Sequence, residues 1–201
     1  FRLPTINELY RPFRVRNDIT EANPSLRTEC FDTVDLGMEW RPARGFSCEL
    51  SLFHQWVDDV IANVPLTDPD EASSLAGFVP EGGSVAQRRN VDQARVRGLS
   101  AVMRWKFSSQ WSGNLKYLFS QSRFTKAVGQ ERLKGQSFPQ SPEHSFIAGV
   151  RGRPFDRLRV FAEVEVGGSQ FDDPMGDRRL GSWWTARLGG EFELAGNVTV
   201  H

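Results

Sequence analysis

Three arginines, Arg95, Arg97 and Arg123, are the residues whose chemistry best suits a binding site. A guanidinium is permanently charged and presents a planar fork of donors, so several together can attract an anionic ligand. All three are expected at junctions between a strand and a loop, where binding residues often lie. Charges that are simply solvated are the alternative interpretation of the same residues.

The histidines and one acidic pair offer no catalytic arrangement. His54 and His144 lack an identifiable serine partner, and no other histidine lies at metal-ligand spacing from His54. Asp58 and Asp59 are neighbours in a predicted strand, so their side chains point to opposite faces and cannot act as a carboxylate pair. We interpret both aspartates as solvated charges at a strand end, and we predict no catalytic residue.

Neither the aspartates of residues 172–177 nor the two cysteines predict a metal site or a disulfide. The spacing of Asp172, Asp173 and Asp177 differs from that of an EF-hand loop, and the two arginines that follow oppose a cation. Cys30 and Cys48 are expected to be free thiols, because the predicted strand pairing places them too far apart to bond. No metal and no cofactor are therefore expected.

The elements that position these residues are clearest at residues 99–119, which alternate between apolar and polar on both sides of one tight turn. A period of two is that of a β-strand whose faces meet different environments. The apolar face holds Leu99, Ala101, Met103, Trp105, Leu115, Tyr117 and Phe119. The polar face holds Arg104, Lys106, Asn114 and Lys116, with Val102 as an apolar exception. Because the apolar residues have odd numbers on both arms, paired residues should have an even sum and share one side of the sheet.

The same alternation predicts about eight antiparallel strands that run up and down along the chain. Short turns are predicted at residues 41–46, 107–111, 153–158 and 193–197. Long polar connections are predicted at residues 64–91, 124–142 and 169–182, well beyond the usual hairpin loop. Such asymmetry is typical of an outer-membrane barrel rather than of a soluble sandwich.

Composition narrows the class of protein further. The 25 basic residues balance the 25 acidic ones, so no charge field favours a nucleic acid. No apolar run approaches the ~18 residues of a transmembrane helix, and the mean hydropathy of −0.44 is low. A barrel is compatible with these values because each of its strands alternates. Tryptophans are expected near strand ends, where aromatic girdles lie, at Trp40, Trp56, Trp105, Trp111 and Trp184.

Several phrases of the sequence resemble the barrel domain of TonB-dependent outer-membrane receptors. They are FRLPTINELYRPFR at residues 1–14, ANPSL at 22–26, LGMEWRP at 36–42, NVDQARVRGL at 90–99 and SFPQSPEHSF at 137–146. The resemblance implies an all-β fold, an antiparallel, up-and-down transmembrane barrel of about 22 strands that encloses a plug. This chain would supply about eight of those strands. Residues 1–201 are then expected to be a C-terminal part of the barrel, with the plug domain, the TonB box and the final strand outside this chain.

The resemblance also implies a function and partners. Members of this family take up scarce ligands across the bacterial outer membrane, such as ferric siderophores, cobalamin or other metal chelates, and they are transporters rather than enzymes. Their energy comes from the TonB–ExbB–ExbD complex, which would act through the missing N-terminal part. Outer-membrane lipid and lipopolysaccharide are further expected partners, and the three arginines could face lipopolysaccharide instead of the transported ligand.

Two other functions are compatible with the pattern. A passive porin would show the same alternating strands, and an upstream plug and TonB box would decide against it. A soluble β-sandwich that binds a ligand would bury the apolar face inside, and it would be soluble without detergent.

Overall fold

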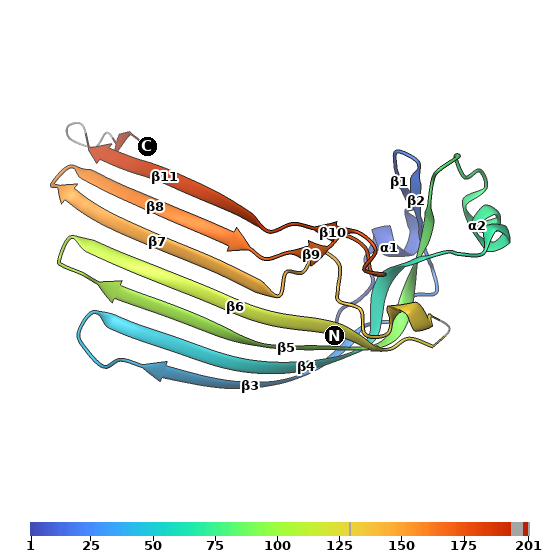
Figure 1. Ribbon diagram of the computed structural model, residues 1–201, viewed down its shortest axis with the longest axis horizontal. Helices are drawn as coiled ribbons and strands as arrows, with labels where there is room; N and C mark the ends of the chain where they lie inside the picture. Colours follow the sequence, from blue (N-terminus) through green and yellow to red (C-terminus); the bar gives the residue numbers. More distant parts are fainter. Residues whose placement is uncertain (129, 194–198, 201) are drawn as a thin grey trace.

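The computed structural model describes every residue except 129, 194–198 and 201. Its long strands form one sheet, and each is antiparallel to the next along the chain (Figure 1). They are β3 (Cys30–Trp40), β4 (Phe46–Pro65), β5 (Val85–Lys106), β6 (Trp111–Lys126), β7 (His144–Phe155), β8 (Leu158–Gly167) and β11 (Trp183–Glu193), followed by the short β12 (Thr199–Val200). The predicted all-β, up-and-down order is confirmed. Because the long strands lie in one sheet, the β-sandwich alternative is wrong.

The register of the hairpins keeps one chemical character on each side of the sheet. In β5 and β6, Leu99 lies opposite Phe119 and Met103 lies opposite Leu115, as predicted. Even-sum pairing recurs in the hairpins β3–β4, β7–β8 and β11–β12. We call the side that carries Leu99 and Leu115 the apolar face, and the side that carries Lys116 the polar face.

The connections differ at the two ends of the sheet (Figure 1). Residues 41–45, 107–110 and 156–157 are tight turns at one end, which we call the turn end. Residues 66–84, 127–143 and 168–182 connect strands at the other end, the loop end. The first of these connections is shorter than the predicted 64–91, because β4 continues to Pro65 and β5 already begins at Val85. The turn predicted at residues 193–197, beyond Glu193, lies outside the described residues.

Asp58 and Asp59 lie inside β4 and not at its end, so that prediction was wrong. Asp59 has a positive φ of 57°, which interrupts the alternation without ending the pairing of β4 with β5. Its carboxylate forms an ion pair with Arg27, and Gln93 donates a hydrogen bond of 2.9 Å to Asp58. The loss of alternation after Val57 therefore marks a local backbone irregularity within a continuing strand.

Small elements at the loop end were not predicted. They are α1 (Ile6–Tyr10), β1 (Phe13–Val15), β2 (Asp18–Glu21), α2 (Pro69–Ala76), η1 (Glu131–Leu133), β9 (Gln170–Phe171) and β10 (Arg179–Leu180). α1 begins after Thr5, because Thr5 and Glu8 form a capping box. β2 pairs with β5 in parallel, which joins Ile19 to Val85 across the sequence. None of the described helices is long and apolar enough to cross a membrane.

The two faces exchange their chemical character near the loop end. On β5 the apolar face changes from Leu99 to Arg97 and Arg95, whereas the polar face changes from Arg104 to the buried Ala94. A cluster of buried side chains covers the polar face there. We call it the loop-end core, and it consists of Val57, Val60, Val64, Val91, Ala94, Phe124, Ala127, Leu133 and Met175. Because Leu133 and Met175 come from connections, two of the long loops fold onto this face.

Tryptophans mark the turn end of the apolar face. Trp105 lies over Gly113, where a Cβ atom would come within 2.8 Å of the indole. Trp111 lies over Gly152 with a corresponding distance of 2.3 Å, so both glycines make room for a large ring. The expected position near a strand end is confirmed for these two residues, but Trp56 lies inside β4.

Candidate functional site

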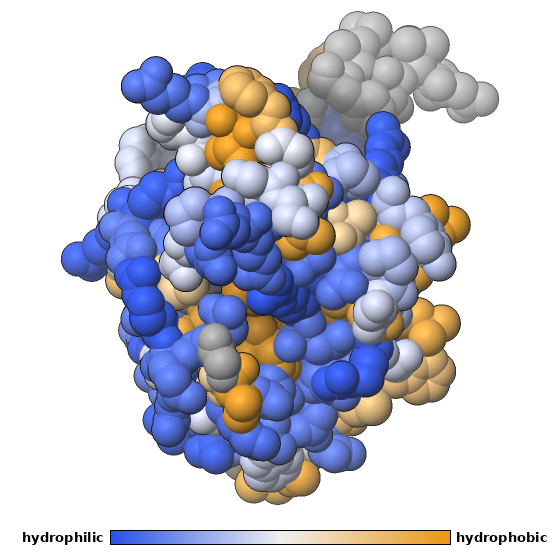
Figure 2. All heavy atoms as spheres, turned by 90° about the vertical axis from the view of Figure 1, so that its right-hand side faces the viewer, coloured by the Kyte–Doolittle hydropathy of each residue, from blue (hydrophilic) through white to orange (hydrophobic). Residues whose placement is uncertain are grey.

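A cavity of about 710 Å³ opens on the polar face at the loop end. Its lining comes from β3, β4, β5 and β6, from the N-terminal segment around α1, and from the connections that follow β6 and β8. Seen from the loop end, hydrophobic residues are visible near the middle of a mostly hydrophilic surface (Figure 2). The cavity thus combines strand residues with residues that only the loops can bring close.

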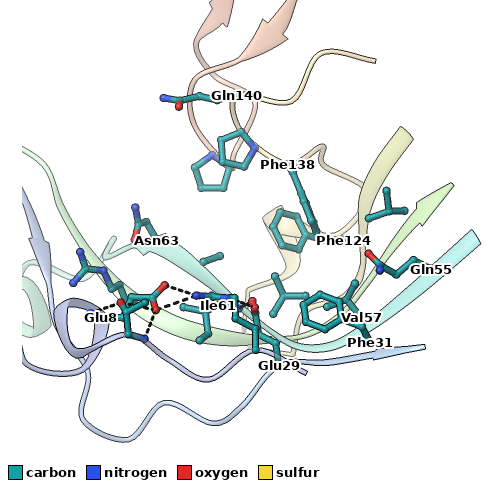
Figure 3. Close-up of a pocket in the computed structure, with 18 of the residues that line it drawn as sticks. Glu8, Glu29, Phe31, Gln55, Val57, Ile61, Asn63, Phe124, Phe138 and Gln140 are labelled. Atoms are coloured by element: carbon teal, nitrogen blue, oxygen red, sulfur yellow. Dashed lines mark hydrogen bonds and ion pairs between the residues drawn. The ribbon is translucent and has the colours of Figure 1, made fainter. Parts of the chain in front are cut away.

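Aromatic and aliphatic side chains form one wall of the cavity (Figure 3). Phe124 of β6 is 2% exposed, and its ring centroid lies 4.8 Å from that of Phe138 in the next connection. The backbone NH of Phe124 donates to Gln136 O at 3.0 Å, which ties this connection to the strand. Phe31 and Val57 complete the wall from β3 and β4. Such a surface suits apolar or aromatic parts of a ligand.

Two glutamates, Glu8 and Glu29, also line the cavity (Figure 3). Glu29 is 5% exposed, accepts a hydrogen bond of 2.7 Å from the NH of Ile61 and forms an ion pair with Arg2. Arg2 also donates to Glu8 at 3.1 Å. Burial alone would raise the pKa of Glu8, but hydrogen bonds from Thr5 and Arg2 outweigh it and lower that pKa. Both carboxylates are thus bound to protein donors.

Arg88 fixes the N-terminal segment onto β5. It is 9% exposed, and its Nη1 atom donates to the carbonyl oxygens of Asn7 at 2.5 Å and Arg11 at 3.0 Å. Its guanidinium also lies over the ring of Phe13, 5.3 Å from the centroid. Arg88 therefore has a positioning role at the edge of the cavity, because its Nη1 atom already donates to two backbone carbonyl oxygens.

The aspartates of residues 172–177 are each engaged separately. Asp173 accepts hydrogen bonds from the backbone NH groups of Met175, Asp177 and Arg178. Burial alone would raise the pKa of Asp173, but these hydrogen bonds outweigh it and lower that pKa. Asp172 accepts from Gln140 at 3.0 Å, and Asp177 forms an ion pair of 3.4 Å with Arg132. The three carboxylates thus shape a loop and do not converge on a common point.

The three arginines singled out in the sequence lie outside this cavity. Arg95 and Arg97 are inside β5, so their expected position at a strand–loop junction was wrong, whereas Arg123 lies near the end of β6. They share a side of the sheet with Leu99, because Arg95 lies opposite Arg123 and Arg97 lies opposite Gln121 in the same register. The structure brings the three together on the apolar side, facing away from the cavity.

The two histidines also lie on the apolar side. His144 Nδ1 is 2.9 Å from the hydroxyl oxygen of Tyr117, and its ring stacks on Tyr117 at a centroid distance of 6.1 Å. His54 packs against Trp56 at 4.2 Å between centroids, and its Nε2 atom is buried without a hydrogen-bond partner. Cys30 and Cys48 are free, as predicted, and lie opposite Asp58 and Trp40. These contacts are those of packed strand residues.

Sequence reasoning did not find the residues that line the cavity. Phe31, Phe124 and Phe138 lie far apart in the sequence and meet only because the connection after β6 folds back onto the sheet. One signal was present, because apolar residues begin to occupy the polar face from Val57 onwards. That signal shows where the loops pack, but not which loop residues reach the sheet.

Comparison with known proteins shows where this fold occurs. A family model described as "TonB dependent receptor-like, beta-barrel" matches residues 1–200. The iron-regulated outer membrane virulence protein of Vibrio cholerae is 25% identical over 151 residues, which cover 74% of this chain and 22% of that protein. The chain thus spans about a fifth of the length of this relative.

Solved structures share the fold at lower identity. The copper transporter OprC has a TM-score of 0.68 at 16% identity over 98% of this chain and 28% of its own. The ferric enterobactin receptor PfeA of Pseudomonas aeruginosa, solved with enterobactin, has a TM-score of 0.64 at 20% identity, covering 90% of this chain and 26% of its own. In such barrels the outward face meets lipid and the inward face meets the lumen, which matches the apolar and polar faces of this sheet. The chain belongs to the β-barrel family of TonB-dependent receptors and forms part of a larger barrel in the bacterial outer membrane.

Proposed function

We propose that this chain is part of the barrel wall of a receptor that imports a metal chelate, and that the loop-end cavity is part of its ligand-binding surface. The main support for this proposal is the position of the cavity, on the lumen-facing side of the sheet and at the end where the long loops lie. In outer-membrane barrels the longer loops are extracellular, so a ligand would reach this surface from outside. Uptake would draw on the TonB–ExbB–ExbD complex through a plug that lies outside this chain, and it requires no catalytic step.

The chemistry of the cavity supports a ligand with apolar or aromatic groups and a small net charge. Its lining includes the phenyl rings of Phe31, Phe124 and Phe138. Its charged residues nearly cancel, since two arginines oppose three carboxylates, and they are Arg2, Arg88, Glu8, Glu29 and Asp172. Iron or copper chelates are the class suggested by the similar structures, which include receptors named for ferric yersiniabactin and ferric enterobactin and a copper transporter.

Uptake by cells that carry the intact receptor tests this proposal. The probes are radiolabelled iron bound to enterobactin or yersiniabactin, and copper ions. The double variant F31A/N63A removes an aromatic and a polar lining group, neither of which is fully buried. We expect the half-saturating concentration of the transported probe to rise by about 10-fold to 150-fold, since a lost aromatic contact costs about 1.5–3 kcal/mol.

The matched control is F155A, because Phe155 is exposed in β7 at the turn end and does not line the cavity. Its uptake should equal that of the unaltered receptor. Unchanged uptake of every transported probe by F31A/N63A would contradict the role of the cavity. Uptake that continues in cells without TonB would instead support the passive porin.

A further inference from the structure

Arg95, Arg97 and Arg123 occupy a defined level on the lipid-facing side of the sheet. Trp105 and Arg95 are ten residues apart on β5, on the same side. At ~3.3 Å per residue and a tilt of about 45°, this separation corresponds to ~23 Å along the membrane normal. The apolar band of such barrels is ~25 Å tall. With Trp105 at one edge of the band, the three arginines lie at the opposite edge, on the side of the long loops.

Aromatic residues lie just below the arginines on the same side. Phe119 and His144 are opposite each other in β6 and β7, with ring centroids 5.2 Å apart. Tyr117 and Phe146 form the next pair, at 4.5 Å. Amphipathic rings concentrate where hydrocarbon gives way to headgroups. This aromatic patch therefore places the arginines among the headgroups of the outer leaflet.

The arginines carry more positive charge than their neighbours neutralise. Arg95 and Arg123 lie directly opposite each other, an arrangement that is unfavourable for like charges. Arg123 forms an ion pair of 2.7 Å with Glu143, and Arg97 donates to the neutral amide of Gln121 at 2.7 and 3.0 Å. Within the described part of the chain, no side-chain hydrogen bond or ion pair involves Arg95. Arg123 also donates to the hydroxyl of Ser137. An anion placed between these strands would relieve the repulsion and accept hydrogen bonds from the free donors of Arg95.

Other carboxylates on this side are either engaged or two strands away. Asp58 accepts a hydrogen bond from Gln93, which occupies one of its oxygens. Asp32 lies on β3, separated from Arg95 by Trp56 of β4 in the same row. Among the described residues, neither aspartate forms an ion pair with Arg95.

We propose that Arg95, Arg97 and Arg123 bind the phosphate groups of a phosphorylated lipid in the outer leaflet, with its acyl chains on Leu99 and Phe119. Guanidinium forks match phosphate oxygens in charge and geometry. The lipid is favoured over a transported anion, because the arginines lie on the side opposite the cavity and continue the apolar face. This site is independent of which chelate the receptor imports.

Binding of lipid A to the purified, delipidated receptor tests the proposal. The intact receptor is titrated in detergent with diphosphorylated lipid A and with the same glycolipid lacking both phosphates, and bound lipid is counted by native mass spectrometry. The double variant R95Q/R123Q should bind the diphosphorylated form at least about tenfold more weakly, since each lost charged hydrogen bond is worth a factor of about ten or more. Both receptors should bind the dephosphorylated form equally and weakly.

Two further variants separate specific binding from general charge and from misfolding. K116Q/R151Q removes two positive charges from the polar face at the turn end and should leave lipid binding unchanged. R95K/R123K keeps the charges but loses the guanidinium forks, so it should bind diphosphorylated lipid A more tightly than R95Q/R123Q, which shows that the altered site still folds. Equal binding of diphosphorylated lipid A by R95Q/R123Q and the unaltered receptor would overturn the proposal. Displacement of lipid A by millimolar inorganic phosphate would also overturn it, because the site would then bind small anions.

Discussion

Replacing Leu115 by arginine tests whether the apolar face contacts lipid. Leu115 lies on β6 inside the apolar band, two residues from Gly113, which lies opposite Trp105 at the edge of the band. Its neighbours across the sheet are Met103 and Ala148, which offer no partner for a charge. An arginine on the lipid face of a barrel costs about 2–4 kcal/mol at the bilayer midplane and less toward the interfaces, so we expect a cost of about 1–3 kcal/mol at this level. The ratio of folded to unfolded receptor should therefore fall by about 5-fold to 150-fold.

The measurement is equilibrium unfolding of the intact receptor in phospholipid vesicles, followed by tryptophan fluorescence in guanidinium chloride. Two controls isolate the charge from other effects. Lys116→Gln changes the adjacent exposed residue on the polar face, and it should shift the unfolding free energy by less than about 0.5 kcal/mol. Leu115→Ala removes apolar area without adding a charge, so its cost should lie below that of Leu115→Arg.

One result would refute the assignment of the faces. If Leu115→Arg and Lys116→Gln change the unfolding free energy by the same amount, the apolar face does not meet hydrocarbon. A larger loss for Lys116→Gln than for Leu115→Arg would mean that the two faces are reversed.

Three further predictions concern packing, the N-terminal segment and the loop after β8. Gly152→Ala places a methyl group 2.3 Å from the indole of Trp111 and should lower the unfolding free energy by about 1–3 kcal/mol in the same assay. The control Gly181→Ala should leave it unchanged, because the added methyl group has no heavy atom within 4 Å. Glu29→Gln weakens a buried ion pair and should speed proteolysis of residues 1–28, with the exposed Glu39→Gln as a control that leaves cleavage unchanged. The pKa of Asp173 is lowered in the folded protein, so its charged carboxylate stabilises the loop fully above the usual pKa of 3.8. This stabilisation is lost as the pH falls through the lower pKa of the folded state. Cleavage of residues 168–182 by an acid-active protease should therefore rise only in that lower pH range. Equally slow cleavage of Asp173→Ala and of the unaltered protein above that pH range would show that this carboxylate does not hold the loop.

The alternation of the sequence determined the strands, their pairing and their two faces. A strand turns successive side chains to opposite sides, so a run such as residues 99–119 shows its apolar face without any long-range information. Tight turns then limit the register, and the even-sum pairing of Leu99 with Phe119 and of Met103 with Leu115 followed. These properties depend on residues close in sequence, which explains why they could be predicted.

Tertiary structure alone decided which residues meet at the loop end. The parallel pairing of β2 with β5, the contact of Arg88 with Asn7 and the position of Phe138 against Phe124 join segments whose meeting depends on how the loops fold. No local period encodes such contacts, because a loop reaches the sheet through its whole path. The candidate cavity was therefore invisible in the sequence.

The arginines show the same division most clearly. The sequence showed their charge and their odd residue numbers, which they share with Leu99. Once the register was known, these odd numbers placed all three arginines on the lipid side of the sheet. Their significance depended on the loops, which cover the polar face at this level with the loop-end core and leave the opposite face to the headgroups. At this level the lumen-facing side becomes apolar, because it packs against the loops, and the outward-facing side becomes charged, because it contacts water and headgroups. This change marks where the sheet leaves the hydrocarbon.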